Sequence, residues 1–183
     1  MRNLAQAFLI ASPVVILGAV SALSAQSAGR QATVAPTPAC AVLSVAEIRR
    51  ITGRADYPDY VDGDPDGEGA GGGSSCQYGG RTFMSVNNPP MLSVVLIKGK
   101  SWTERSRGSA PPPGCQRESV AGVGDDAFFQ VCPASRLRRS PPLYVKAGAN
   151  DLIVQMDVDP PATQESVRPI VIAVAKAAAL KLR

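Results

Sequence analysis

The segment from Cys115 to Val158 decides the fold of this chain. It reads CQRESVAGVGDDAFFQVC from 115 to 132 and, after a short basic loop, PLYVKAGANDLIVQMDV from 142 to 158. Three apolar runs are separated by Gly, Asn, Asp and Pro, the residues that turns require; the runs are Ala127 to Val131, Leu143 to Ala147 and Leu152 to Val158. The pattern predicts a meander of antiparallel strands with a cysteine at each end of its first arm. Its core candidates are Phe128, Leu143, Tyr144 and Ile153.

The sheet is expected to extend toward the N-terminus. Leu92 to Lys98, LSVVLIK, is rich in β-branched and aliphatic residues and predicts a central strand. Cys76-Gln77-Tyr78 opens an earlier strand, with residues 82–86 as its possible partner.

One helix is predicted on each side of these strands. Ser44 and Glu47 have the spacing of a capping box, and Gly53 ends the short helix that follows. The last helix runs from about Pro161 to Leu182, or starts nearer Ser166 with Pro169 in its first turn. Its apolar face would lie across the sheet and comprises Val167, Ile170, Val171, Val174, Ala178 and Leu182.

These elements predict an α+β fold, in which an antiparallel sheet carries a short N-terminal helix and a long C-terminal helix on one face. The domain would span residues 40–183, preceded by a flexible tether at 29–39. Residues 56–73 contain six acids and no base among many glycines, so we expect a disordered acidic loop there.

Residues 1–28 resemble a secretory signal peptide. Arg2 precedes an apolar run from Leu4 to Val20, and small residues follow as far as Ala28. The alternative is an uncleaved membrane anchor, but the run is short for a spanning helix and Pro13 interrupts it. We therefore expect a periplasmic or secreted bacterial protein, which contacts a membrane only through this segment if it is not cleaved.

If the protein is exported, the four cysteines are expected to form disulfides. In an oxidising compartment they predict two disulfides, for which three pairings exist. We favour Cys40 with Cys76 and Cys115 with Cys132. The spacings fit no zinc site, since the chain has no C-x-x-C and no histidine.

Composition excludes several functions. Without histidine, no Ser-His-Asp or Cys-His arrangement can form. The net charge of +4 is too small to indicate nucleic acid, and the stacking aromatics of single-strand binders are missing. No residue is singled out as catalytic, and no cofactor is implied.

Three charged motifs are candidate sites. Asp62, Asp64 and Asp66 match the start of a calcium loop, but the twelfth position is Gly73 instead of Glu, which favours a solvated loop. Asp125-Asp126 is interpreted as turn capping, because adjacent strand residues point to opposite faces. The cluster Arg136 to Arg139, together with Lys98, Lys100, Arg105 and Arg107, is either ordinary surface charge or a patch for an anionic envelope polymer or lipid headgroup.

Several blocks resemble a family of uncharacterised exported domains from actinobacteria, many of them lipoproteins. The blocks are CAVLSVAEIRRITG from Cys40, CQY from Cys76, VAGVGDDAFF from Val120 and the alanine-rich C-terminal helix. The family is similar to extracellular sensor domains of mycobacterial receptor kinases. The resemblance implies an α+β domain without assigned catalysis, although Cys40 lies too far from the leader to carry a lipid.

The expected function is therefore a non-enzymatic binding or sensor-like domain for an unknown envelope protein or ligand. Two alternatives stay open: a carboxylate-dependent envelope hydrolase or transferase, and a structural accessory protein of the cell envelope.

Overall fold

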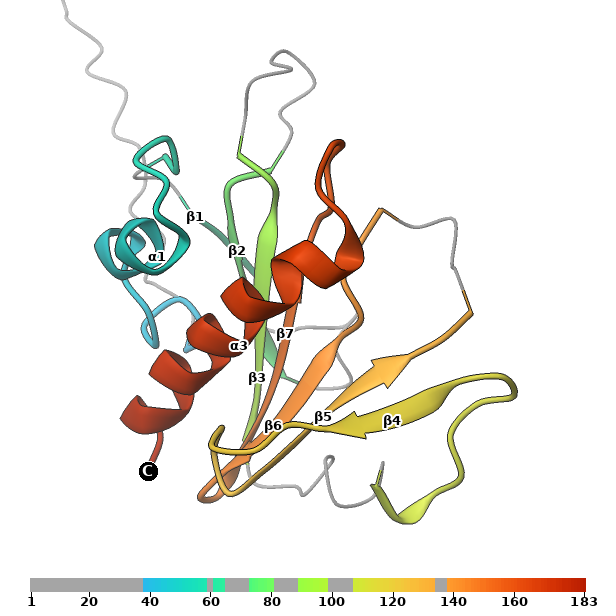
Figure 1. The fold of residues 1–183 in the computed structure, drawn as a ribbon. Coiled ribbons are helices and arrows are strands. Elements are labelled where there is room, and N and C mark those ends of the chain that lie inside the picture. Colours follow the sequence, from blue (N-terminus) through green and yellow to red (C-terminus); the bar gives the residue numbers. More distant parts are fainter. Residues whose placement is uncertain (1–37, 59–60, 65–72, 81–88, 99–106, 134–137) are drawn as a thin grey trace, which may run out of the picture. The chain divides into compact units, whose positions relative to one another are not determined.

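One antiparallel sheet organises the described part of the chain, which comprises residues 38–58, 61–64, 73–80, 89–98, 107–133 and 138–183 of a computed structural model. These residues lie within one unit, Val34–Arg183. The strands in them have the order β1-β2-β3-β7-β6-β5-β4 (Figure 1). They are β1 Val61–Asp64, β2 Ser74–Tyr78, β3 Leu92–Lys98, β4 Gln116–Ser119, β5 Asp126–Val131, β6 Leu143–Ala147 and β7 Asn150–Met156. The helices are α1 Val45–Thr52 and α3 Gln164–Lys181.

The two helices lie on the same side of the sheet. α3 packs on β6 and β7, and α1 packs on α3 (Figure 1). The predicted α+β architecture is therefore confirmed. β3 and β6 have the predicted bounds, while β5 and β7 begin one and two residues earlier than the apolar runs. The proposed partner strand at 82–86 lies outside the described residues.

The core lies between the sheet and α3. The central strands give alternate residues to it, as in the register row Leu96, Leu152, Val145 and Ala127. The helix faces this row with buried valines and alanines, which let its backbone come close to the strands; they are Val167, Val171, Val174, Ala175, Ala178 and Ala179. Of the other positions predicted for this face, Ile170 and Leu182 are half-buried against the core.

Phe128 and Tyr144 are buried on the opposite face of the sheet, as their alternation with core residues requires. Their ring centroids are 5.2 Å apart. The guanidinium carbons of Arg107 and Arg117 lie 5.2 and 5.3 Å from the centroid of Phe128. Around Phe128, this second face is thus covered by aromatic and arginine side chains. Ile153 is only half-buried there.

Both helix starts follow from local sequence. Ser44 and Glu47 form the predicted capping box of α1, and Gly53 caps its C-terminus in the left-handed conformation. α3 begins with a second capping box between Thr163 and Ser166. Pro169 is therefore the sixth residue of α3, inside the helix as a start near Pro161 implied, and beyond the first turn that a start near Ser166 would give it. The cap at Thr163 satisfies the first amides, and the helix continues through the proline at the loss of one backbone hydrogen bond.

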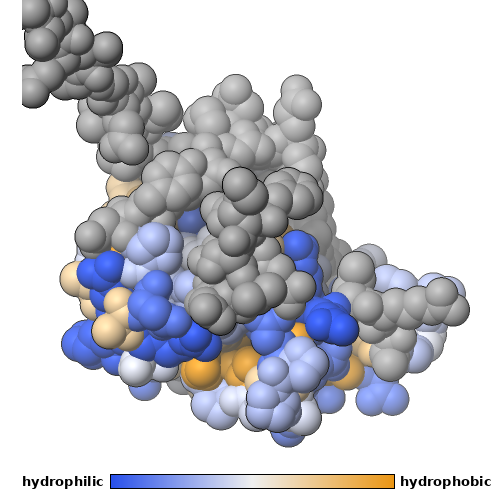
Figure 2. All heavy atoms as spheres, turned by 90° about the horizontal axis from the view of Figure 1, so that it is seen from above, coloured by the Kyte–Doolittle hydropathy of each residue, from blue (hydrophilic) through white to orange (hydrophobic). Residues whose placement is uncertain are grey.

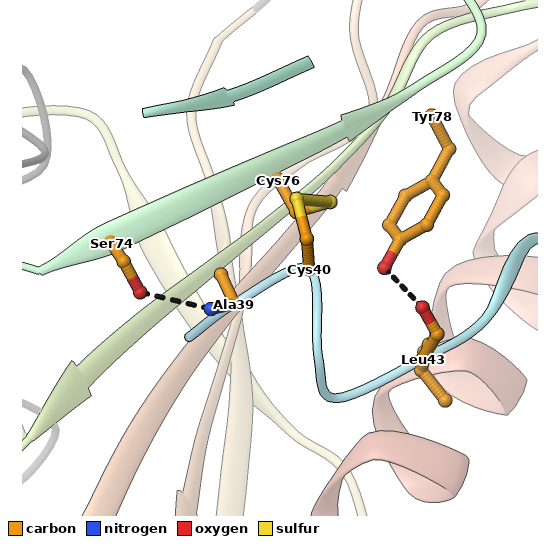
Figure 3. The surroundings of a disulfide bond; sticks show 6 residues. All are labelled: Ala39, Cys40, Leu43, Ser74, Cys76 and Tyr78. Atoms are coloured by element: carbon orange, nitrogen blue, oxygen red, sulfur yellow. Dashed lines mark hydrogen bonds between the residues drawn. A yellow bond between two sulfur atoms is a disulfide. The ribbon is translucent and has the colours of Figure 1, made fainter. Parts of the chain in front are cut away.

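A disulfide ties the segment before α1 to the sheet. Cys40 is bonded to Cys76 of β2, with their Cα atoms 4.9 Å apart. Around it, Ala39 N donates to Ser74 Oγ at 3.0 Å and Tyr78 Oη donates to the Leu43 carbonyl at 2.8 Å (Figure 3). These contacts fix the short α1, which has too few residues to be stable alone.

The second predicted disulfide is also present. Cys115 and Cys132 lie directly opposite each other at the open end of the β4–β5 hairpin, with Cα atoms 4.0 Å apart. Two disulfides are typical of proteins from oxidising compartments. No helix in the described ranges has the length and apolar content that a membrane span requires.

Two predicted flexible segments are partly ordered. Ala39, assigned to the tether, is fully buried beside the Cys40 bridge. Within the predicted loop 56–73, Tyr57 is 1% exposed and accepts hydrogen bonds from Arg49 through its carbonyl, and β1 pairs with β2. Backbone pairing needs no apolar side chains, and the ring of Tyr57 is long enough to reach the core. Residues 1–37, 59–60 and 65–72 lie outside the described part.

Candidate functional site

A groove runs between the edge strand β4 and the N-terminal half of α3. We call it the β4–α3 groove; its volume is about 430 Å³. Its strand side consists of Glu118, Ser119, Val120 and Ala121, its helix side of Glu165, Arg168, Pro169 and Ile172, and Phe129 of β5 also lines it. The groove is open to solvent and combines polar with apolar lining residues, which makes it the candidate ligand site of the described residues.

Arg168 is the central polar residue of the groove. Its side chain is 17% exposed, and its guanidinium carbon lies 4.7 Å from the centroid of the Phe129 ring. It donates to Glu118 Oε2 at 2.5 Å and contacts Glu165 at 3.5 Å. One guanidinium therefore holds two carboxylates, one from the strand and one from its own helix.

The fold positions these three side chains separately. Glu118 is held on β4, which is closed by the Cys115–Cys132 bridge at one end and by the Val120 N to Ala127 O bond of 2.9 Å at the other. Glu165 and Arg168 are three positions apart in the first turns of α3, so that they lie on one side of the helix. The two acids differ in solvent exposure: the Glu165 side chain is 80% exposed and the Glu118 side chain is 44% exposed.

The groove has charged groups and apolar groups side by side. Phe129 is buried, Val120 and Ile172 are half-buried, and Glu118, Ser119 and Glu165 are exposed. The same mixture occurs on the face shown in Figure 2, where hydrophobic residues in orange reach the surface among hydrophilic ones in blue. The groove can therefore hold a ligand that has both an apolar part and a charge.

Of the three aspartates of the candidate calcium loop, two lie in the described part of the chain. Asp62 and Asp64 are in β1, where residues 62–64 pair in regular antiparallel register with β2, whereas a calcium loop needs a curled backbone. Asp66 lies outside the described residues. Within the described ranges, no group of three or more His, Cys, Asp or Glu side chains is placed to hold a metal ion.

Asp125 and Asp126 point apart, as the sequence predicted. Asp125 accepts from Gly148 N at 2.7 Å and pairs with Arg183 at 3.0 Å. Asp126 pairs with Arg107 on the face of Phe128. On that face Asp126, Lys146 and the buried Asp151 form one cross-strand row of alternating charge. Opposite charges placed across strands stabilise the sheet, which gives this acidic pair a structural role.

The basic cluster is only partly described. Residues 136 and 137 lie outside the described part, as do Lys100 and Arg105. Arg139 pairs with Asp157 at 3.1 Å, and the carbonyl of Arg138 accepts from Val158 N at 2.8 Å. Arg138 and Arg139 therefore join the loop to the end of β7. Because Arg139 is already paired with Asp157, it is less available to bind an anion.

No sequence pattern singles out the residues of the β4–α3 groove. Glu118 is one of several polar residues between Cys115 and Val120, and Arg168 is one base in a long helix. Only the i, i+3 spacing of Glu165 and Arg168 could have suggested a pair, and it occurs on many helices.

No protein-family model, curated protein or solved structure matches this chain. The geometry of the groove therefore carries the functional argument.

Proposed function

We propose that this protein is an exported, non-enzymatic binding domain and that the β4–α3 groove is its ligand site. The observation that carries the proposal is the half-buried Arg168, which lies over Phe129 and is held by Glu118 and Glu165 at the edge of the groove. Such a preformed ion-pair cluster beside apolar walls can orient a ligand without rearranging. Export is supported by the leader-like segment 1–28 and by the two disulfides.

A site-directed binding experiment tests the proposal. The purified protein, labelled with ¹⁵N, is screened by NMR against a library of small amphipathic compounds, and the amides that shift are mapped. We expect the hits to cluster at Ser119, Val120 and Ile172. Ala121→Arg, which places a long side chain in the groove, should abolish them. The matched control is Ala149→Arg, because Ala149 is equally exposed but lies in the β6–β7 turn. Hits that survive Ala121→Arg would contradict the proposal.

A carboxylate-dependent hydrolase or transferase is the second candidate, because two carboxylates face the same groove. It predicts turnover of a chromogenic ester, glycoside or peptide substrate that is lost in Glu118→Gln or Glu165→Gln. Turnover lost in either variant would overturn the non-enzymatic proposal. Turnover that neither substitution affects would show contamination or chemistry elsewhere.

A further inference from the structure

We propose that the ligand of the β4–α3 groove is an extended polypeptide segment, which adds as a strand to the free edge of β4 and places one aliphatic and one basic side chain in the groove. This inference rests on the proposed function and names the chemical class of its ligand.

The first support is the open edge of β4. Among the described residues, β4 is the last strand of the sheet and pairs only with β5. Val120 N donates to Ala127 O, so the backbone groups of Glu118, two residues earlier, also point toward β5. Those of Arg117 and Ser119 consequently point away from the sheet. Ser119 is exposed, and no described residue hydrogen-bonds to its outward groups. An unpaired edge of this kind can accept a peptide strand.

The second support is charge. Two carboxylates and one guanidinium leave the groove with one net negative charge. Glu165 is the loosely held acid, since it contacts Arg168 at 3.5 Å and is 80% exposed. A lysine or arginine of the ligand can therefore pair with Glu165 while Glu118 keeps its contact with Arg168. An acidic ligand side chain would instead be repelled by both carboxylates.

The third support is the position of the apolar residues. Val120, Pro169 and Ile172 line the groove alongside the strand edge. Alternate residues of an added strand point to the same face and are about 7 Å apart. A segment with an aliphatic residue two positions from a basic one can thus fill the apolar part of the groove and reach Glu165 at the same time.

A second copy of this chain is the competing occupant of the edge. Backbone pairing through Arg117 and Ser119 allows three symmetric antiparallel registers, centred on Arg117, Glu118 or Ser119. The first two place like charges directly opposite each other, which destabilises a strand pair, whereas the register centred on Ser119 does not. Self-pairing is therefore an outcome that the experiment distinguishes from binding of a different segment.

Three end-blocked pentapeptides and one amine test this inference by ¹⁵N–¹H NMR titration of the purified protein. The first peptide, Thr-Lys-Thr-Leu-Thr, has the required alternation. The second replaces its lysine with glutamate, and the third is methylated on the backbone nitrogen of the central threonine. Hexylamine supplies an apolar body and a positive charge without any peptide backbone. We expect saturable shifts at Ser119, Val120 and Ile172 with the first peptide, and much weaker binding of the second and third.

Protein variants then identify the contact. Glu165→Gln should weaken binding of the lysine peptide by up to about fivefold, the upper end of the range for one exposed ion pair. Asp56→Asn, which removes the same charge outside the groove, should leave binding unchanged. Equal binding of the methylated peptide, or of the glutamate peptide, would overturn strand addition.

The remaining outcomes separate the two proposals. If hexylamine shifts the groove amides and the lysine peptide does not, the ligand is not a peptide strand but the groove is still a binding site. If neither probe shifts them, both proposals are wrong. A rise in molecular mass of the protein alone, measured by light scattering and abolished by Ser119→Pro, which removes an outward-pointing backbone N–H of β4, would show that β4 pairs with a second copy instead.

Discussion

The ammonium group of Lys181, at the end of α3, lies 2.7 Å from Oε1 and 2.8 Å from Oε2 of Glu47, which is 134 positions away in the first turn of α1. The backbone N–H of Ser44 donates to the same carboxylate at 2.9 Å. The C-terminal helix is thereby joined to the N-terminal cap of the first helix. These two partners, Lys181 first, lower the pKa of Glu47 from 4.5 to about 2.

The stabilisation from this pair should depend on pH. Because the pKa of Glu47 is depressed in the folded state, its contribution is fully present above the ordinary pKa of glutamate and is lost as the pH falls toward 2. Glu47→Gln, which keeps a hydrogen-bonding cap, should lower the free energy of unfolding by about 1 kcal/mol at pH 7 and have little effect near pH 2. Urea unfolding at both pH values measures this. In a Lys181→Met background the effect at pH 7 should shrink; an effect independent of Lys181 would show that the cap alone matters.

Gly124 and Gly122 should respond very differently to alanine. Both have positive φ, but a Cβ on Gly124 would lie 2.1 Å from the carbonyl oxygen of Lys146, whereas a Cβ on Gly122 meets nothing within 4 Å. Gly122→Ala should therefore cost about 1 kcal/mol for its backbone conformation alone. Gly124→Ala must also displace β6 and should cost about 3 kcal/mol or more. Thermal unfolding of both variants checks the difference, and equal losses would contradict this account of the turn.

The sequence predicted the buried strands but not the edge strands. β3, β5, β6 and β7 each contain an apolar run, and burial of such a run sets both its position and its register. β4 has the sequence Gln-Arg-Glu-Ser and β1 Val-Asp-Gly-Asp, neither of which shows an apolar pattern. These two strands exist because their backbones pair with an already formed neighbour. A pattern of side chains cannot reveal that cause.

The same reason explains why the groove escaped prediction. Its wall is an edge strand, and its central ion pair joins Glu118 to Arg168, 50 positions apart. Residues brought together only by the packing of α3 over the sheet leave no local signal. The disulfides could be predicted because four cysteines, if they lie in an oxidising compartment, allow only three pairings.

The two disulfides should differ in their effect on stability. In the chain-entropy model, the Cys115–Cys132 loop of 17 residues contributes about 3 kcal/mol and the Cys40–Cys76 loop of 36 residues about 4 kcal/mol. Cys40–Cys76 also fixes the segment before α1 to the core, since Cys76 is fully buried while Cys132 is exposed. Paired Cys→Ala variants, compared by urea unfolding, should show the larger loss for Cys40 and Cys76. A larger loss for the Cys115 and Cys132 pair would show that the β4–β5 hairpin limits stability.

Alkaline titration should report on the buried tyrosines. Burial raises the pKa of Tyr57 to about 12 and raises that of Tyr78 still further. Their hydroxyls donate to the carbonyls of Pro90 at 3.0 Å and Leu43 at 2.8 Å. The neutral forms are therefore favoured in the folded state, and the stability they contribute is fully present below the ordinary tyrosine pKa of about 10 and lost as the pH rises through 12.

In the near-ultraviolet, we expect the tyrosinate absorbance of these two residues to develop only together with the loss of native circular dichroism. Tyr57→Phe and Tyr78→Phe should each remove part of this high-pH increase in tyrosinate absorbance, which assigns the increase to these two residues. Tyr78→Phe should in addition destabilise the protein by about 1 kcal/mol or more at neutral pH, because the Leu43 carbonyl is left buried without its donor. Full ionisation of all tyrosines near pH 10 in a protein that is still folded would contradict the burial of both rings.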